Sequence, residues 1–445
     1  MINLWCNKNL VDSQLFLWKL LSENENNIEY YSDPYDSHVE IVILNTCSFI
    51  SSWREEMFQT VDKLLSLDKK ICIIWCGVQY FEKLLKKNSK LDQLLQSELN
   101  RWNTLLLNNN ISYLSWNDLS LANLQSLISR STDFDDFCWY HAPRLLTNYE
   151  NRYEYLKIAE WCNNSCAFCI IPQIRWKLTS LPIKSVVLEA ENLLKQWVEE
   201  LIIVAQDTMR YWTDFSSKSQ LLPLLYELDK LPYDFKYRIL YLYPDILTLK
   251  QLEEFASLKK FIPYFDIPLQ HISPKLLKSM WRFYDDKMIH SLLKWIRNLF
   301  SDAFIRTNII VWFPWETDED MKLLKDFLSE DYFDNIALFE YHDEPLALSS
   351  TFENKVDDKT IHDRFKVINK QVDTLLSNRE KRRKNKRQIW FVEWIKQHKK
   401  DILLRIRPEI NCPEIDPSDN VKLENVTQCF DWDEIDIWSK VEYIK

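Results

Sequence analysis

Three cysteines within one short stretch offer the clearest chemistry in this chain. Cys162, Cys166 and Cys169 are spaced C-x3-C-x2-C in E-W-C-N-N-S-C-A-F-C. Three thiolates can hold three corners of a cubane [4Fe–4S] cluster and leave the fourth iron without a protein ligand. A structural zinc ion needs four ligands, and no histidine or fourth cysteine lies close by. The spacing therefore predicts an iron–sulfur cluster whose open iron binds a substrate or cofactor; the alternative is a loop of three buried thiols.

Three further cysteines, Cys6, Cys47 and Cys76, stand where predicted strands or their loops end. Loops at the carboxyl ends of parallel strands converge on one site. Although they are far apart in sequence, these cysteines could therefore meet at a second cluster. The alternative is that each is a small buried core residue, which is a common role for a cysteine thiol. The residues alone leave both interpretations open.

The N-terminal third of the chain alternates predicted strands and helices. Residues 38–45 (H-V-E-I-V-I-L-N) and 70–75 (K-I-C-I-I-W) are apolar, β-branched runs of strand length, and residues 52–67 between them have helical spacing. Short buried strands that alternate with helices indicate a parallel sheet. Residues 110–150 are polar and irregular, so we interpret them as a connector between domains.

A longer α/β block begins near Tyr153 and leads directly into the cysteine stretch. Apolar residues from Ile183 to Trp197 form one helical stripe. The repetition of strands and helices predicts an open or closed (β/α) barrel with its site at the carboxyl ends of the strands. The expected strands are residues 201–205, 237–243, 262–267, 305–311 and 335–339.

The last part of the chain changes character. Residues 364–388 have a helical pattern that ends in R-E-K-R-R-K-N-K-R, which indicates either a solvated helix face or a contact with RNA or the ribosome. Residues 389–445 alternate short apolar runs with turns, as in a small all-β module. We therefore expect three domains, at residues 1–130, 145–380 and 385–445.

Composition narrows the class of protein. With 445 residues, 46% of them hydrophobic, the chain can bury several cores. It contains no run of eighteen apolar residues, so we expect no membrane span. Ten cysteines without a recognisable leader favour metal and redox chemistry in a reducing cytoplasm over disulfides. The net charge of −10 disfavours broad nucleic-acid binding and suits a basic partner.

With these motifs in view, the chain resembles the radical S-adenosylmethionine (SAM) methylthiotransferases. W-C-N-K-N-L-V-D-S near the N-terminus resembles the family's G-C-P-K-N-L-V-D-S, N-T-C-S-F-I at residues 45–50 resembles its second cysteine motif, and W-C at residues 75–76 its third. The stretch around Cys162 resembles the radical SAM motif itself. The resemblance implies a flavodoxin-like parallel-sheet domain, a central radical SAM partial (β/α) barrel and a small C-terminal TRAM β-barrel.

The resemblance also implies the cofactors and their ligands. Cys162, Cys166 and Cys169 would hold the [4Fe–4S] cluster that binds SAM, with Phe168 near the adenine. The three N-terminal cysteines would hold an auxiliary [4Fe–4S] cluster that supplies the sulfur. An electron donor would start the reductive cleavage of SAM, and the methylthio group would go to an unactivated carbon. The residues with implied cluster ligation are Cys6, Cys47, Cys76, Cys162, Cys166 and Cys169.

Two branches of this family differ in substrate. One modifies the β-carbon of an aspartate in protein twelve of the small ribosomal subunit, and the other modifies an adenosine of tRNA. A-Q-D-T at residues 205–208, P-L-Q-H at residues 268–271 and C-P-E-I-D at residues 412–416 resemble the first branch. We therefore expect a ribosomal-protein methylthiotransferase, with a tRNA methylthiotransferase and a non-catalytic iron–sulfur scaffold as alternatives. We use His271 only as a marker of the branch and not as a catalytic residue. The alternative is a polar residue at a strand end whose hydrogen bonds are satisfied.

The use of glycine departs from the family pattern. The chain contains one glycine, Gly77, and nineteen tryptophans, whereas average usage of ~7% would give roughly thirty glycines. At several positions where the family has glycine, this chain has tryptophan. The hypothesis is that these residues are glycine in the organism, because UGA codons that it reads as glycine were translated as tryptophan; the alternative is an enzyme rich in tryptophan. The positions concerned are Trp5, Trp75, Trp161, Trp176, Trp197, Trp212, Trp312 and Trp315.

Overall fold

The computed structural model describes residues 1–4, 6–23, 28–86, 93–114, 144–147, 151–174, 177–384, 389–398, 401–423, 426, 428–429 and 440–442. It divides into two compact units, each assembled from segments that are distant in sequence. The first unit comprises Met1–Thr147, Glu160–Glu189 and His342–Thr351, and the second comprises Asn148–Ala159, Ala190–Tyr341 and Phe352–Lys445. The central cysteine stretch therefore belongs to the same unit as the N-terminal cysteines.

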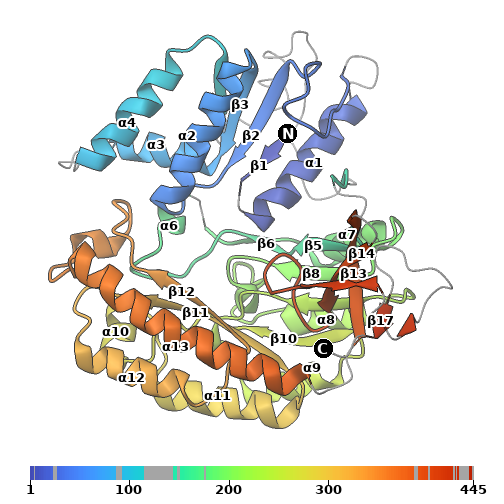
Figure 1. Ribbon diagram of the computed structural model, residues 1–445, viewed down its shortest axis with the longest axis vertical. Helices are drawn as coiled ribbons and strands as arrows, with labels where there is room; N and C mark the ends of the chain where they lie inside the picture. The colour runs from blue at the N-terminus through green and yellow to red at the C-terminus, as the bar shows by residue number, and fades with distance from the viewer. Residues whose placement is uncertain are drawn as a thin grey trace. The chain divides into compact units, whose positions relative to one another are not determined.

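The first unit is built on a parallel sheet whose strands follow the order β1-β2-β3-β4 (Figure 1). The strands are β1 (Ile2–Asn3), β2 (Ile41–Thr46), β3 (Lys70–Trp75) and β4 (Ile111–Leu114). Its longer helices are α1 (Asn7–Glu23), α2 (Ser51–Ser66), α3 (Cys76–Lys86) and α4 (Gln93–Leu106). Three short elements follow the connector: β6 (Ala159–Glu160), α6 (Ile171–Ile174) and β7 (Thr179–Ser180).

Both faces of this sheet are buried, because successive side chains of a strand point to opposite faces. On β2, Val42 and Leu44 join a core that contains apolar side chains of α2, α3 and α4. Ile43, between them, joins a second core with Phe16 and Leu20 of α1. Burial on both faces explains why β2 and β3 have nearly continuous apolar sequences.

The second unit contains a six-stranded sheet in the order β12-β11-β10-β9-β8-β5, and every neighbouring pair is parallel. Each strand thus lies next to its predecessor in the sheet, as in a (β/α) barrel. The strands are β5 (Tyr153–Lys157), β8 (Glu200–Val204), β9 (Lys236–Ile239), β10 (Phe261–Asp266), β11 (Phe304–Val311) and β12 (Asn335–Glu340).

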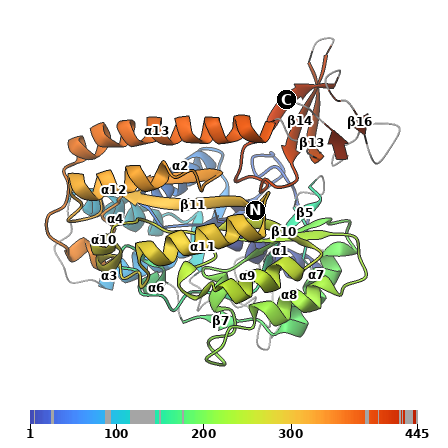
Figure 2. The same ribbon diagram turned by 90° about the horizontal axis from the view of Figure 1, so that it is seen from below.

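Helices connect these strands, and α8, α9 and α11 lie along one face of the sheet while α13 lies near β12 (Figure 2). The α-helices are α7 (Ile183–Leu194), α8 (Leu221–Asp229), α9 (Leu249–Ser257), α10 (Pro274–Ser279), α11 (Asp286–Leu299), α12 (Asp318–Leu328) and α13 (Asp358–Lys384). The 3₁₀-helices are η1 (Thr208–Arg210), η2 (Pro244–Ile246) and, in the first unit, η3 (Leu348–Thr351). Among the described residues, no helix is long and apolar enough to cross a membrane.

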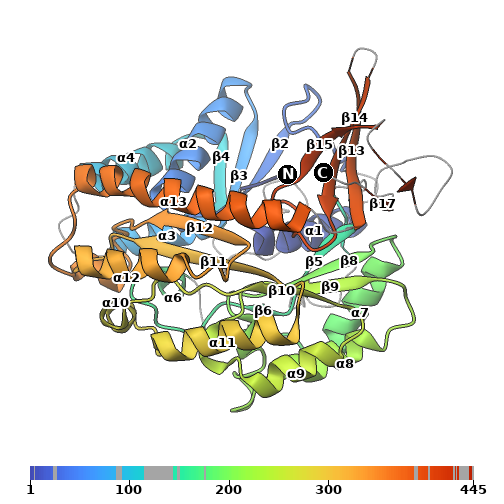
Figure 3. The same cartoon turned by 60° about the horizontal axis from the view of Figure 1, so that its bottom comes forward.

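The C-terminal strands, which we call the C-terminal β module, form an antiparallel sheet in the order β15-β14-β13-β17-β16 (Figure 3). Trp390 and Val392 of β13 pack against Leu404 and Ile406 of β14 and against Val421 in a small core. The strands are β13 (Ile389–His398), β14 (Asp401–Pro408), β15 (Asp419–Lys422), β16 (Gln428–Cys429) and β17 (Lys440–Glu442).

The predicted fold class is confirmed: an N-terminal parallel sheet, a central parallel sheet with connecting helices, and a C-terminal antiparallel module. The interpretation of residues 110–150 as irregular connector is wrong at its start, because β4 pairs there with β3. The four residues of β4 are only moderately apolar, so the sequence pattern did not identify them as a strand. They form a strand because they pair with β3 at the edge of the sheet. The three domain boundaries stay a prediction, and the end of the basic run lies partly outside the described residues.

The backbone sets several tryptophans apart. In the described part of the chain, seven tryptophans have φ between 58° and 74°, in the left-handed region that glycine adopts readily and that disfavours residues with a Cβ. Trp5 and Trp176 of the hypothesis lie outside the described residues. The other six named positions all have positive φ, and Trp281 is an additional case. The seven are Trp75, Trp161, Trp197, Trp212, Trp281, Trp312 and Trp315.

Candidate functional site

The central cysteine loop runs from β6 to α6 and leaves its three thiols half-buried. The Cys169 amide donates to the carbonyl of Cys166 at 3.0 Å, which closes a turn between the last two cysteines. The Asn164 amide donates to Cys162 Sγ at 3.3 Å. A backbone donor to sulfur favours the thiolate form, which is the form that binds iron. This part of the loop is therefore suited to hold a metal centre at a partly open surface.

Hydrogen bonds and apolar packing hold the cysteine loop in place. The amide of Ser349 donates to the carbonyl of Ala167 at 2.8 Å, and Asn163 Oδ1 accepts from the Leu178 amide at 2.9 Å. Ile170 and Ile174, just beyond the last cysteine, pack into the core under the N-terminal sheet. Ile170 and Ile174 thus hold the end of the loop in the core, whereas the three cysteines stay only half-buried.

The structure brings the three N-terminal cysteines together, as the carboxyl-end argument predicted. Cys47 follows directly on β2, Cys76 follows directly on β3, and Cys6 lies between β1 and α1. A hydrogen bond with the Cys6 thiol, together with burial, raises the pKa of Cys47 well above its usual range, and Cys76 adds to the shift. The binding of iron there must release the thiol protons, because the ligand is a thiolate.

Polar groups beside Cys76 fix this site. Asn9 Nδ2 lies 4.0 Å from Cys76 Sγ and donates to Asn45 Oδ1 and to the Thr46 carbonyl, both at 3.1 Å. The amide of Gly77 donates to Thr46 Oγ1 at 2.9 Å. A Cβ at Gly77 would stand 2.6 Å from that same oxygen, so this close approach requires glycine. N-K-N-L-V-D and N-T-C therefore contribute asparagines and a hydroxyl that position the sulfur.

Whether these cysteines suit an iron–sulfur cluster is decided by the chemistry of the donors. In the described ranges no three His, Cys, Asp or Glu side chains are arranged around one point as ligands of a single metal ion. A cubane cluster does not need that arrangement, because each thiolate binds a different iron. Both sets consist of three cysteines, and thiolate is the ligand that such clusters use. The donor sets therefore fit [4Fe–4S] clusters better than a mononuclear metal.

Phe168 is half-buried beside Cys169 in the central loop. No contact in the structure tests its expected place near the adenine, so that role stays a prediction. Trp161 and Trp75 directly precede Cys162 and Cys76, and both have positive φ. Both cysteines therefore follow a residue in the left-handed region, which glycine adopts more readily than tryptophan.

Sequence reasoning missed a buried polar pair that follows β10 and β11. His271 Nε2 lies 3.9 Å from Glu316 Oε2, and both side chains are fully buried. Burial lowers the pKa of His271 to about 4 and raises the pKa of Glu316 to about 8. Glu316 Oε2 accepts from the amides of Trp312 and Phe313 at 2.6 and 3.3 Å. His271 lies just after a strand, as expected, but it is not fully satisfied: its Nδ1 accepts from the Ser273 amide at 2.9 Å, and its Nε2 has no hydrogen-bond partner among the described residues. Glu316 lies in the stretch V-W-F-P-W-E-T at residues 311–317.

Comparison with known proteins places these features in a class. Residues 156–328 match the model of the radical SAM superfamily, and residues 1–96 match that of "uncharacterized protein family UPF0004". Among solved structures, the chain is similar to the radical SAM methyltransferase TsrM from Kitasatospora setae, with 13% identity, a TM-score of 0.45 and coverage of 72% of this chain and 66% of that one. The cysteine loop and strands β8 to β11 lie within the residues that match the radical SAM superfamily model.

Curated relatives define the family more closely. The chain is 32% identical to the ribosomal protein uS12 methylthiotransferase RimO of Pseudothermotoga lettingae, over 86% of this chain and 85% of the relative. It is 35% identical to RimO of Aquifex aeolicus over 77% of this chain and 72% of the relative, and 32% identical to RimO of Carboxydothermus hydrogenoformans over 95% and 92%. The chain belongs to the RimO family of SAM-dependent methylthiotransferases.

Proposed function

We propose that this enzyme adds a methylthio group to the β-carbon of an aspartate in ribosomal protein uS12. The observation that carries the proposal is the presence of two cysteine triplets in one compact unit of a chain that matches RimO proteins over most of its length. A reaction of this kind needs two functions, activation of an inert carbon and delivery of sulfur, and each triplet can supply one.

Each triplet has a separate role in the proposal. Cys162, Cys166 and Cys169 would hold a [4Fe–4S] cluster with an open iron for SAM, and the three N-terminal cysteines would hold the auxiliary cluster. When bound, these groups supply one-electron cleavage of SAM and a source of sulfur. The protein supplies the cysteines, the half-buried loop and the asparagine and hydroxyl groups that fix Cys76. Phe168 would line the adenine side of the loop.

The partners follow from the substrate. Ribosomal proteins are basic, and the net charge of −10 on this chain favours association with such a protein. A ribosomal protein as substrate supports a cytoplasmic location for the enzyme, where an electron donor would reach the cluster that binds SAM. The tRNA adenosine branch is the competing substrate class, and no feature of the described residues favours it.

Mass spectrometry of both candidate substrates tests the proposal. The enzyme is reconstituted anaerobically with iron and sulfide, reduced, and incubated with SAM and either small ribosomal subunits or unmodified tRNA. The expected result is a uS12 aspartyl peptide heavier by one methylthio group in place of hydrogen. A methylthio group on tRNA alone would move the enzyme to the other branch. SAM that stays uncleaved under reduction would support a non-catalytic iron–sulfur scaffold.

A further inference from the structure

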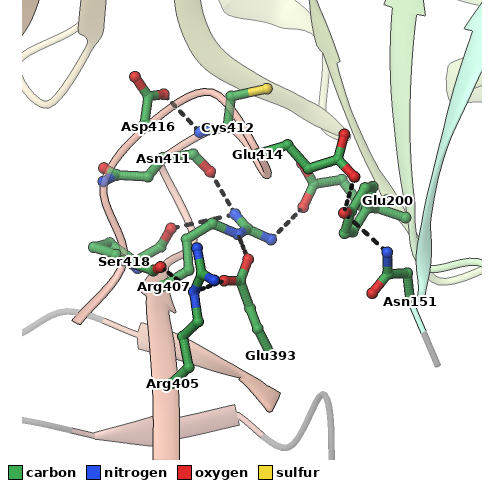
Figure 4. Close-up of polar contacts among 12 residues, drawn as sticks. Asn151, Glu200, Glu393, Arg405, Arg407, Asn411, Cys412, Glu414, Asp416 and Ser418 are labelled. Carbon is green, nitrogen blue, oxygen red and sulfur yellow. Dashed lines mark hydrogen bonds and ion pairs between the residues drawn. The ribbon is translucent and has the colours of Figure 1, made fainter. Parts of the chain in front are cut away.

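Arg407 of the C-terminal β module is buried between two carboxylates (Figure 4). Its Nε donates to Glu393 Oε1 of β13 at 2.7 Å, and its Nη2 donates to Glu200 Oε2 at 3.1 Å. Glu200 is the first residue of β8 in the six-stranded sheet. A single guanidinium therefore joins a strand of the module to a strand of the radical SAM sheet.

Arg238 of β9 completes the arrangement from the side of the sheet. Its Nε donates to the other oxygen of Glu200 at 2.6 Å. Its two remaining nitrogens donate to the carbonyls of Glu409 and Ile410, both at 2.8 Å. Both oxygens of Glu200 are thus occupied, and Arg238 is also bonded to the chain that follows β14.

The segment that follows β14, residues 409–416, makes further bonds to the same sheet; we call it the anchor segment. Glu414 accepts from the hydroxyls of Tyr153 and Tyr155 at 2.9 Å each. Asn335 Nδ2 donates to Asp416 Oδ1 at 2.6 Å, and Asp416 Oδ2 accepts from the Cys412 amide at 2.8 Å. The anchor segment therefore contacts β5, β9 and β12.

These contacts lie at one end of the sheet. Tyr153, Glu200 and Asn335 are the first residues of β5, β8 and β12, so the anchor segment lies at the amino ends of the parallel strands. C-P-E-I-D, which the sequence offered as a marker of the substrate branch, thus bonds to the sheet at the amino ends of its strands. Its acidic residues serve to dock the module.

The burial of these charges explains why the docking is specific. The side chains of Arg238, Arg407 and Glu200 are each 3% exposed or less. A buried ion pair contributes little net stability when it is intact, but the loss of one partner leaves an uncompensated buried charge and is strongly unfavourable. If the module moved away from the sheet, Glu200 and Arg407 would each lose a partner. Only one position of the module satisfies both.

We propose that Arg407 and Glu200 are positioning residues that hold the C-terminal β module as one rigid body with the radical SAM sheet. The module then presents a fixed surface to the ribosomal protein, and a pre-set geometry lowers the entropic cost of orienting a large substrate. The part of this inference that concerns the substrate rests on the proposed function. The docking itself does not.

The test compares Arg407→Met with Arg405→Met. Arg405 lies on the same strand, but its side chain is 54% exposed and it pairs with Glu393 at 3.5 Å and with Ser418, so its removal should have little effect. Backbone hydrogen exchange is measured on the reconstituted full chain. In Arg407→Met, exchange in residues 401–416 should accelerate by about tenfold or more while β10 and β11 stay protected, since the lost partner is a buried one. Arg405→Met should match the parent.

Steady-state kinetics distinguish a positioning role from a purely structural one, because only a positioning role changes KM for the ribosomal substrate. In Arg407→Met, KM for small ribosomal subunits should rise by about tenfold, by the same reasoning on pre-set geometry, while kcat and substrate-free cleavage of SAM stay at parent values. If exchange in the anchor segment is equal in the two variants, the docking role is refuted. If exchange accelerates but KM does not change, the substrate role is refuted.

Two further readouts keep the test decisive. Should Arg407→Met fail to fold, Glu200→Gln replaces it: this change keeps the shape of the side chain and one acceptor oxygen but removes the negative charge that pairs with Arg407 and Arg238. Faster exchange in residues 401–416 would then support the docking role, and unchanged exchange would refute it. Should the parent enzyme leave uS12 unmodified, the proposed function fails, whereas the hydrogen-exchange result still decides the docking.

Discussion

Two of the tryptophans with positive φ occupy the same place at the end of a helix. Trp197 follows α7, and the Val198 amide donates to the carbonyl of Leu193 at 3.4 Å. Trp281 follows α10, and the Arg282 amide donates to the carbonyl of Leu277 at 2.8 Å. In each case a backbone amide donates a hydrogen bond to the carbonyl five residues earlier, and the residue just before the donor is left-handed. This arrangement is the Schellman motif at the C-terminus of a helix, and its left-handed position is usually glycine. The φ angles thus support glycine at these positions on grounds independent of family resemblance.

Replacement of Trp197 measures the strain directly. Its side chain is 81% exposed, so little packing is lost when it is removed. We expect Trp197→Gly to be more stable than Trp197→Ala by about 1 kcal/mol, because both lose the indole and only alanine keeps a Cβ in the left-handed region. Chemical denaturation checks this difference. As a control, Trp102→Gly in the middle of α4, where the indole is buried in the core, should destabilise by about 3–5 kcal/mol.

The codons test the hypothesis of a recoded glycine. It predicts UGA at the eight positions named in the hypothesis, which include Trp5 and Trp176, and also at Trp281, whose φ is positive. It predicts UGG at helical tryptophans such as Trp102. DNA sequencing of the gene gives the answer. UGG at all of the positive-φ positions would refute the hypothesis and establish an enzyme that tolerates tryptophan at strained turns.

At the scale of elements, the loops after β10 and β11 are joined by the buried pair of His271 and Glu316. The folded state favours protonated Glu316, since its pKa is raised from 4.5 to about 8. The contribution of protonated Glu316 to the free energy of unfolding is therefore fully present below pH 4.5, and it is lost as the pH rises toward 8. For His271 the pKa is lowered to about 4, so the neutral form is favoured and stability is lost as the pH falls from 6.5 toward 4.

Glu316→Gln separates these two effects. The free energy of unfolding of the variant, relative to the parent, should increase by about 3 kcal/mol between pH 5 and pH 8, because glutamine has no proton to lose. The effect of His271 is the same in both proteins and cancels. Urea denaturation at the two pH values checks the difference. A constant difference would show that Glu316 is already ionised at pH 5.

Much of the element order could be read from the sequence, and the reasons are specific. Apolar runs such as residues 70–75 identified strands, and the cysteines at their ends were expected to converge, which Cys6, Cys47 and Cys76 do. The pair of His271 and Glu316 could not be read, because it depends on which strands are neighbours. The docking of residues 409–416 was missed for the same reason, since its partners lie on β5, β9 and β12.

At the scale of the whole molecule, the proposal requires two metal centres in one chain. Anaerobic protein should contain about eight iron and eight sulfide per chain, as two [4Fe–4S] clusters require. The triple change of Cys162, Cys166 and Cys169 to Ala should halve both values and abolish cleavage of SAM. Iron and sulfide analysis checks the first result, and chromatography of the SAM products checks the second. An unchanged iron content would refute the assignment of the central triplet.

The separation of the two triplets is the central claim, and Cys47→Ala tests it most directly. This change removes one thiolate from the N-terminal set and leaves Cys162, Cys166 and Cys169 in place. The measurement is the amount of 5′-deoxyadenosine and of methylthio-uS12 formed by the same reduced sample. We predict that deoxyadenosine still forms while methylthio-uS12 does not, because the site for SAM is intact and the source of sulfur is lost. Modification of uS12 at the parent rate would contradict the account and leave the N-terminal cysteines as ordinary core residues.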